Sequence, residues 1–340
     1  MRPRLLARRT LLGAAGGVLA APAVLAQAPV TLRFATHEPE DAFVYAGTWK
    51  PWLERVLQET GGALQIDAFT GGRMAPSSEA HLDLVLSGKA DIAFIVPPIF
   101  RDRFLEQDLF MQPGLLRDAR EASLAATRLQ ARGLLSGFDG LVPLGVLVAA
   151  PSAVHATVPV GRPEDLRGRR FNTNAALTVD LFRRLGADMS LTYVTPRAAA
   201  TLRANQFDGV IADWVGSDTF GTLAAAHHHL DYPLGGVMLV FVMNRTSYDR
   251  LPGAIRAAFD RHKGDELADG FGRAFDGRRR DVVARVRSEA GQSVVTPEGA
   301  AAAAWADAFA PGVEAWRTAN PRNGLLARAL DAELASIRAT

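Results

Sequence analysis

Two titratable side chains directly follow the first predicted strand. Residues 30–35 alternate between apolar and polar types as a strand does, and Thr36-His37-Glu38-Pro39 come next. Open α/β sheets bind their ligands at the carboxyl ends of the strands, where polar side chains can contact them. We therefore expect His37 and Glu38 to lie in a ligand-binding cleft.

A run of three histidines, His227-His228-His229, is a second group with coordinating chemistry. Consecutive side chains point in different directions on a helix or a strand, so three rings cannot converge on one ion without distortion. No spaced partner of the H-E-x-x-H kind accompanies them. We therefore expect no metal site at this run.

Sequence motifs for catalysis are missing from the chain. It has no G-x-S-x-G elbow, no P-loop and no dinucleotide-binding fingerprint outside a predicted leader. The absence of cysteine excludes thiolate nucleophiles, thiolate-bound metals, disulfides and iron–sulfur clusters. The sequence therefore favours a binding protein over an enzyme, and we expect no cofactor.

Length and charge narrow the class further. A chain of 340 residues is long enough for about two domains, and 48% hydrophobic with 22% charged residues is typical of globular proteins. The 38 basic residues nearly balance the 36 acidic ones, and four of the arginines belong to the predicted leader. The mature chain is thus close to neutral, which argues against binding to nucleic acid.

Residues 1–26 have the pattern of a signal peptide. A basic stretch from Arg2 to Arg9 precedes an apolar run that ends in Val24-Leu25-Ala26. The segment from Arg8 to Leu12 resembles a twin-arginine export signal, and an ordinary secretory signal is the alternative. Both would carry the chain out of the cytoplasm. No later run reaches about 18 apolar residues, so we expect no membrane insertion of the mature chain.

Short predicted strands alternate with longer helices along the rest of the chain. The expected strands are 30–35, 64–69, 91–96, 141–150, 169–173, 207–211 and 237–244. The expected helices are 49–59, 79–86, 177–185, 195–203, 255–288 and 297–316. Repeated βα units imply an α/β fold with doubly wound open sheets.

The long strands near 141–156 and 235–246 are expected to cross between two lobes. The predicted division assigns 29–150 and about 240–275 to lobe I, and 151–239 and about 276–340 to lobe II with hinge-spanning helices. A chain that crosses twice between lobes indicates a hinge around a central cleft.

Six short segments, in their order and spacing, resemble a known family. They are Leu32–Thr36, Leu86–Ala93, Glu164–Phe171, Leu202–Val210, Phe241–Asn244 and Tyr248–Pro252. The chain resembles the periplasmic solute-binding subunits of tripartite ATP-independent periplasmic (TRAP) transporters, of the dicarboxylate-binding type. The resemblance implies two α/β lobes, two crossing strands and long C-terminal helices along the hinge.

The resemblance also shows where this chain departs from the family. An arginine that grips the ligand carboxylate follows the segment at 164–171 in the family, and that position here is Asn172. A tyrosine often found in the helix before Asp208 corresponds to Ala199. Arg170 lies two residues before Asn172, where the family usually has a lysine that is not a ligand. Arg170, Arg101 or a bound cation would have to replace the missing guanidinium.

Asp213 and Trp214 fall on a segment that borders the cleft in the family. The resemblance therefore implies that Trp214 forms a flat wall of the pocket. Asp213 can accept a hydrogen bond from a ligand hydroxyl or amine, or help to hold a cation; a solvated loop carboxylate is the alternative.

Arg101 and Arg103 lie in a stretch that corresponds to "G-R-F-P" in the family. The match favours Arg103 as a structural residue or a residue of the cleft edge. Arg101 is the nearby candidate for the missing cation.

These observations predict a periplasmic binding protein that captures a small organic solute, an organic acid or a related compound, between its lobes and delivers it to TRAP membrane permease subunits. Without an arginine at position 172, the solute is expected to be larger or less acidic than a C4 dicarboxylate. An exported cofactor- or metal-dependent enzyme and the binding module of a signalling receptor remain the alternatives.

Overall fold

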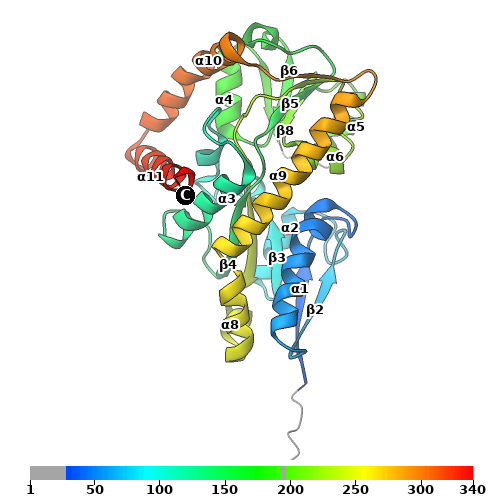
Figure 1. The fold of residues 1–340 in the computed structure, drawn as a ribbon, viewed down its shortest axis with the longest axis vertical. Coiled ribbons are helices and arrows are strands. Elements are labelled where there is room, and N and C mark those ends of the chain that lie inside the picture. Colours follow the sequence, from blue (N-terminus) through cyan, green and yellow to red (C-terminus); the bar gives the residue numbers. More distant parts are fainter. Residues whose placement is uncertain (1–27, 193–196, 340) are drawn as a thin grey trace, which may run out of the picture.

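A computed structural model describes residues 28–192 and 197–339, so the predicted signal peptide lies outside the described part of the chain. The described residues form two lobes, each built on a mixed sheet that helices cover (Figure 1). This arrangement confirms the α/β fold with two lobes joined by crossing strands.

The sheet of lobe I has the strand order β2-β1-β3-β10-β4. Its strands are β1 (Val30–Ala35), β2 (Leu64–Phe69), β3 (Ile92–Ile95), β4 (Leu141–Val148) and β10 (Met238–Asn244). β1 pairs in parallel with β2 and β3, whereas β10 runs antiparallel to β3 and β4. The next two strands along the chain, β2 and β3, lie on opposite sides of β1 in the sheet, and a crevice is expected at the carboxyl ends of β1 and β3.

The sheet of lobe II has the order β11-β9-β5-β8-β6-β7. Its strands are β5 (Ala153–Ala156), β6 (Arg170–Thr173), β7 (Asp188–Leu191), β8 (Gly209–Ala212), β9 (His228–Leu230) and β11 (Ser293–Val295). β6 pairs in parallel with β7 and β8, and β5 runs antiparallel to β8. The run β7-β6-β8-β5 therefore repeats the topology of β2-β1-β3-β10, and the carboxyl ends of β6 and β8 are neighbours.

The two lobes are joined where β4 leads into β5 and where β9 leads into β10. Backbone hydrogen bonds tie these two crossing segments together, because Ser152 N donates to the carbonyl of Gly235 at 2.7 Å and Leu234 N donates to that of Ser152 at 3.0 Å. Ala149 N also donates to the carbonyl of Val237 at 2.9 Å. The connection is thus a paired hinge, as the long apolar strands in the sequence predict.

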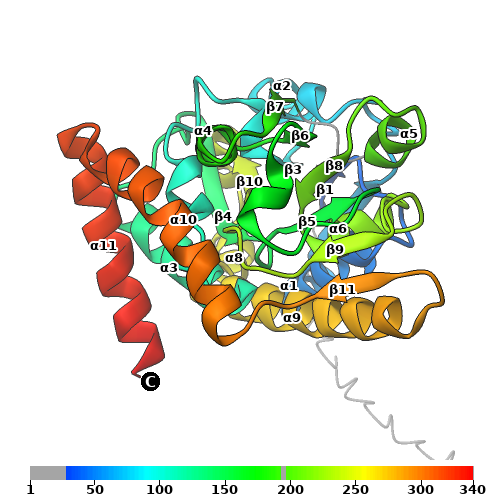
Figure 2. The ribbon, with the colours of Figure 1, turned by 90° about the horizontal axis from the view of Figure 1, so that it is seen from above.

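Helix α9 (Asp265–Ser288) runs along both lobes (Figures 1 and 2). It packs on α3 (Ala119–Ala131) and β4 in lobe I, and on α6 (Trp214–Thr219) and β11 in lobe II. Helix α10 (Gly299–Thr318) packs on lobe II and α11 (Pro321–Arg338) returns to α3 of lobe I. These contacts place the C-terminal helices across the boundary between the lobes.

The remaining helices are shorter. They are α1 (Lys50–Glu59), α2 (Glu79–Leu86), α4 (Ala176–Arg184), α5 (Ala198–Arg203), α7 (Arg245–Asp249), α8 (Gly253–His262), a π-helical turn η1 (Val44–Trp49) and the 3₁₀ segments η2 (Pro97–Ile99), η3 (Gln107–Met111) and η4 (Pro163–Leu166). Within the described ranges, no helix combines the length and apolar character needed to cross a bilayer.

The structure differs from the predicted elements in several places, and helices α3 and α11 and strands β9 and β11 are among the elements that were not predicted. The single helix expected over 255–288 is broken into α8 and α9 at Gly264, whose φ of 70° is open to glycine but strained for other residues. The strand β7 (Asp188–Leu191) was not predicted, because it is only four residues long and just two of them, Met189 and Leu191, are apolar. The start of the helix expected from 195 lies outside the described residues.

Candidate functional site: a cavity between the lobes

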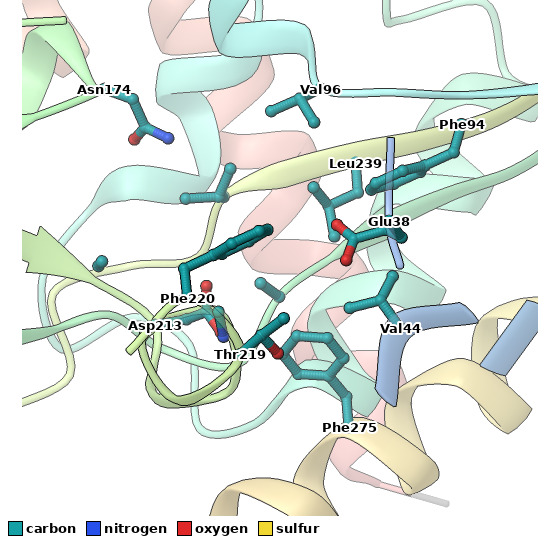
Figure 3. A pocket seen from close by; sticks show the side chains of 14 residues that line it. Glu38, Val44, Phe94, Val96, Asn174, Asp213, Thr219, Phe220, Leu239 and Phe275 are labelled. Carbon is teal, nitrogen blue, oxygen red and sulfur yellow. The ribbon is translucent and has the colours of Figure 1, made fainter. Parts of the chain in front are cut away.

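A cavity lies where the strand ends of the two lobes face each other (Figure 3). Lobe I contributes Glu38, which follows β1, and Val96, which follows β3. Lobe II contributes Asn174 after β6 and Asp213 after β8. Ligands of open α/β sheets bind at this kind of position, so the repeated topology brings two such crevices together into one site.

Glu38 is a buried carboxylate at this cavity, with 4% of its surface exposed. Its backbone is held at both ends, since Glu38 N donates to Thr36 Oγ1 at 3.1 Å and the Glu38 carbonyl accepts from Gly71 N at 2.7 Å. Glu38 Oε1 lies 3.3 Å from Nε2 of His37. Oε2 has no hydrogen-bond partner in the described structure. One carboxylate oxygen is therefore free to accept a bond from a ligand.

Asp213 faces the same cavity from lobe II. It caps α6, and its Oδ1 accepts from Gly216 N at 2.8 Å. Burial raises the pKa of Asp213 to about 6, although backbone N–H groups of Gly216 and Val215 oppose the shift; the negative charge of Glu38 adds to it. The structure thus brings together Glu38 and Asp213, two of the predicted site residues.

His37 lies beside Glu38 and lines an adjoining hollow. Its ring stacks on Phe94, with 5.6 Å between the centroids, and lies 5.8 Å from the ring of His81. Phe220 lines both this hollow and the main cavity. The hollow therefore forms a mouth between the lobes, with Arg197 on its other side.

Asn172 lines a smaller cavity that shares Asn174 and Ala212 with the main one. Its side chain is buried, and Nδ2 donates to Thr192 Oγ1 at 2.7 Å and to the Ser190 carbonyl at 3.4 Å. The amide nitrogen of Asn172 is thus already hydrogen-bonded to β7 and to the residue that follows it. It lies next to the main cavity and not on its wall.

The three arginines predicted as site residues do not line the main cavity. Arg170 forms an exposed ion pair with Asp208, with Nη2 3.0 Å from Oδ1. Arg103 donates to the carbonyls of Gly137 at 2.7 Å and Asp139 at 2.5 Å, which favours the structural role.

Arg101 is the nearest of the three to the cavity. Its Nη2 donates to the backbone carbonyl of Asn174, a lining residue on the opposite lobe. Burial lowers the pKa of Arg101 from its usual value, against the negative charge of Asp108. Arg101 therefore links the two lobes beside the site, with its guanidinium directed at protein backbone.

Trp214 lies in the core of lobe II, and the structure does not place it on the cavity wall. The side chain is fully buried, and Nε1 donates to Asp231 Oδ1 at 2.9 Å. Its ring contacts those of His155 and His229, at centroid distances of 4.7 and 5.1 Å. The reason is geometric: Asp213 caps α6 and faces the cavity, so the next residue points into the packing between the sheet and α9.

Most of the cavity wall is apolar. It includes Val44, Phe94, Leu239, Phe220 and Phe275. Asn174 could have been found from the sequence, since it follows a predicted strand end just as Glu38 does. Phe275 could not, because α9 is distant in the chain and only the folding of this helix across both lobes brings it to Glu38.

The site can accept hydrogen bonds and bury apolar surface, and it has the features of a binding pocket. In the part of the chain that the structure describes, no three His, Asp or Glu side chains form a group that could hold a metal ion. In the histidine run, His229 lies on β9 and is buried against His155, whereas His227 precedes the strand and is exposed.

The chain is similar to known binding and transport proteins. Residues 34–318 match the family model described as bacterial extracellular solute-binding protein, family 7. A curated relative, the outer membrane transporter protein TsaT of Comamonas testosteroni, is 25% identical over 248 residues, which is 71% of each chain.

Solved structures share the fold. A marine metagenome TRAP solute-binding protein in complex with 3-hydroxybenzoate has a TM-score of 0.83 at 21% identity, covering 91% of this chain and 99% of that one. A TRAP solute-binding protein from Rhodoferax ferrireducens with copurified benzoate has a TM-score of 0.80 at 21% identity, covering 90% and 98%. One from Bordetella bronchiseptica with bound mandelate has a TM-score of 0.79 at 21% identity, covering 91% and 100%.

The family match spans both lobes, the crossing strands and α10, so it includes every residue that lines the cavity. The resemblance found in the sequence motifs is therefore confirmed, and this chain belongs to family 7 of the bacterial extracellular solute-binding proteins.

Proposed function

We propose that this protein is the periplasmic solute-binding subunit of a TRAP-type transporter, that it performs no catalysis, and that its solute binds in the cavity between Glu38 and Asp213. The observation that carries the proposal is the meeting of two sets of strand ends, β1 and β3 with β6 and β8, at one cavity next to a paired hinge. Export by residues 1–26, by the twin-arginine route, and delivery to permease subunits complete the proposal.

A solute that touches both lobes stabilises the closed arrangement in proportion to its greater affinity for that form. Contacts to Glu38 and Phe94 on one side and to Asp213 on the other meet this requirement. A dissociation constant near 1 μM corresponds to roughly −8 kcal/mol, which a few charge-assisted hydrogen bonds and buried apolar surface can supply.

The proposed solute has a ring or a compact hydrocarbon body. Three phenylalanines, Phe94, Phe220 and Phe275, and several aliphatic side chains line the cavity. The three structures of similar fold bind 3-hydroxybenzoate, benzoate and mandelate, each of which contains a benzene ring. Simple C4 dicarboxylates fit this lining less well, because they offer little apolar surface and two charges.

The direct test is native purification followed by mass spectrometry of any co-purified small molecule. A solute at a hundredfold excess over its dissociation constant should stabilise the fold by roughly 2.7 kcal/mol, which raises the melting temperature. The same compound should be recovered unchanged after long incubation. Chemical turnover of the compound would contradict the proposal and favour an exported enzyme.

A further inference from the structure

The charge of the main cavity is the feature that the family resemblance does not explain. Glu38 and Asp213 both line it, and its described lining includes no lysine or arginine. Burial raises the pKa of Asp213, and the charge that adds to the shift is the negative one of Glu38. Among the described residues, the cavity wall therefore has two acidic groups and no lysine or arginine.

The nearby arginines have other partners or lie outside the cavity. Arg101 donates to the Asn174 carbonyl, and Arg170 pairs with Asp208. Arg197 is exposed and lines the mouth rather than the cavity. His37 lies 3.3 Å from Glu38 Oε1 and does not reach Oε2. A ligand carboxylate placed here would meet two acidic groups without a compensating guanidinium.

The unpaired carboxylate oxygen of Glu38 is a second, independent indication that the ligand carries a hydrogen-bond donor. The residue is 4% exposed, it lines the cavity, and its Oε2 is buried without a hydrogen-bond partner. A buried acceptor left unpaired is costly, and an N–H donor from a ligand removes that cost. In Figure 3 the carboxylate of Glu38 points into the space that Phe220 faces from the other lobe.

The aromatic lining fits the same ligand chemistry. Phe94, Phe220 and Phe275 surround the space next to the two carboxylates. Faces of phenylalanine rings attract a cation through the ring quadrupole, and this attraction strengthens when the cation leaves water. A positively charged group in this cavity would thus be stabilised both by the two carboxylates and by the phenylalanine rings.

We propose that the solute presents a protonated nitrogen to Glu38 and Asp213, so that the ligand class is an organic amine with a ring or compact hydrocarbon body. The proposal rests on the proposed function, since it concerns the solute of the same cavity. It differs from the acids that the structures of similar fold bind. Two carboxylates alone do not make a calcium or magnesium site, which needs six or more oxygens.

The test compares matched compounds by calorimetry at pH 7.5 and low salt. Benzylammonium, phenethylammonium and cyclohexylammonium are set against benzoate, phenylacetate and cyclohexanecarboxylate. At least one amine should bind, and it should bind about 30-fold or more tightly than its matched acid, as expected when a buried charge has its partner.

Variants assign the effect to the two carboxylates. Glu38→Gln and Asp213→Asn keep the shape of each side chain, and asparagine still caps α6. Each should weaken amine binding at least tenfold while the melting temperature stays near that of the unaltered protein. Glu79→Gln, an exposed acid at the mouth, removes the same charge and should leave the affinity within about twofold.

The outcomes separate this inference from the proposed function. Acids that bind while no amine of the set does would overturn the amine proposal and leave the solute-binding function intact. Stabilisation by calcium chloride alone, lost in Glu38→Gln, would assign the cavity to a metal ion and also overturn it. Amine binding that neither cavity variant weakens would mean that the amine binds elsewhere, which contradicts the proposal. If neither acids nor amines bind and no small molecule co-purifies, both proposals fail.

Discussion

Trp214 stabilises lobe II through its packing and one hydrogen bond. It has no exposed surface, and its indole N–H donates to Asp231, which also accepts from Arg279. Replacement of a buried tryptophan by alanine removes this contact and leaves a cavity, so Trp214→Ala should lower the free energy of unfolding by about 3–5 kcal/mol. Solute affinity of the folded fraction should stay nearly unchanged, because the ring does not line the site.

Denaturant unfolding and calorimetry on the same sample measure the two quantities. Trp214→Phe keeps most of the volume and should cost less stability than Trp214→Ala. If Trp214→Ala left the free energy of unfolding unaltered and abolished solute binding, Trp214 would be a residue of the pocket wall, as the sequence resemblance implies.

A buried pair of histidines should make lobe II sensitive to acid. His155 Nδ1 lies 2.8 Å from His229 Nδ1, and His229 Nε2 lies 2.9 Å from Gln292 Oε1. Gln292 Nε2 donates to the Leu223 carbonyl, so its Oε1 accepts, and His229 donates from Nε2. His155 must then donate from Nδ1, and both rings are neutral. Burial, helped by His229, lowers the pKa of His155 well below 6.5.

The direction of the pH effect follows from this shift. The unfolded chain binds a proton at His155 near pH 6.5 and the folded chain does not, so the contribution to stability is present above pH 6.5 and is lost as the pH falls. Burial also lowers the pKa of His81 to about 4, which acts in the same direction. These two histidines should therefore lower the free energy of unfolding between pH 7 and pH 5, whereas Asp213, whose pKa is raised to about 6 by burial, acts in the opposite direction because its folded carboxyl takes up a proton first.

Urea unfolding across this range tests the effect. The variant His155→Gln should show a shallower dependence on pH than the unaltered protein. Equal slopes for the two proteins would exclude the histidine pair as the cause.

At the scale of elements, the crossing segments determine how the lobes meet. Gly235 has a φ of 85°, and a Cβ at this position would lie 2.4 Å from Cα of Met111. Gly235→Ala should therefore destabilise the protein by about 1–3 kcal/mol, because backbone atoms in lobe I would have to move. Gly133→Ala is the matched control, since Gly133 has a φ of 71° but nothing within 4 Å of its Cβ position.

Thermal unfolding of both variants separates backbone strain from the clash. Gly133→Ala should lose only the stability that the positive φ costs an alanine. An equal loss in both variants would show that the close approach of the crossing segment to Met111 has no energetic consequence.

The elements of the first half of lobe I could be predicted closely. Strands at Val30–Ala35 and Leu64–Phe69 were expected over the same residues, because each alternates and is bounded by turn residues. The break at Gly264 was missed, since one glycine inside an apolar helical pattern is usually tolerated. Helix α11 was not predicted, and its packing on α3 depends on contacts that no local pattern contains.

Two of the predicted site residues line the main cavity, Glu38 from the strand-end rule and Asp213 from the family resemblance. Glu38, which follows β1, lines the main cavity as the strand-end rule predicts, and His37 lies at the adjoining mouth. Two other positions carried over from the family by alignment do not line this cavity, because Asn172 lies in an adjoining cavity and Trp214 lies in the core. A one-residue step along a chain turns a side chain from the cleft into the core, as Asp213 and Trp214 show, and alignment at this distance does not resolve such a step.

For the whole molecule, the central claim is that solute held between the strand ends of both lobes favours the closed arrangement. The chain has no cysteine, so introduced cysteines can be labelled uniquely. Ser77 on lobe I is exposed and lines the mouth, and the exposed Ala200 lies on α5 of lobe II, close in sequence to Arg197 on the other side of that mouth. Spin labels on Ser77→Cys with Ala200→Cys therefore report the opening between the lobes.

The measurement is the distance distribution between the two spin labels with and without saturating solute, with occupancy confirmed by calorimetry. A labelled pair within lobe I, Ser77→Cys with Lys89→Cys, serves as the control and should not change. Solute should shift the pair across the mouth to a single, shorter distance, because the solute binds the closed form more tightly. An unchanged distribution at full occupancy would contradict the claim that closure of the two lobes captures the solute.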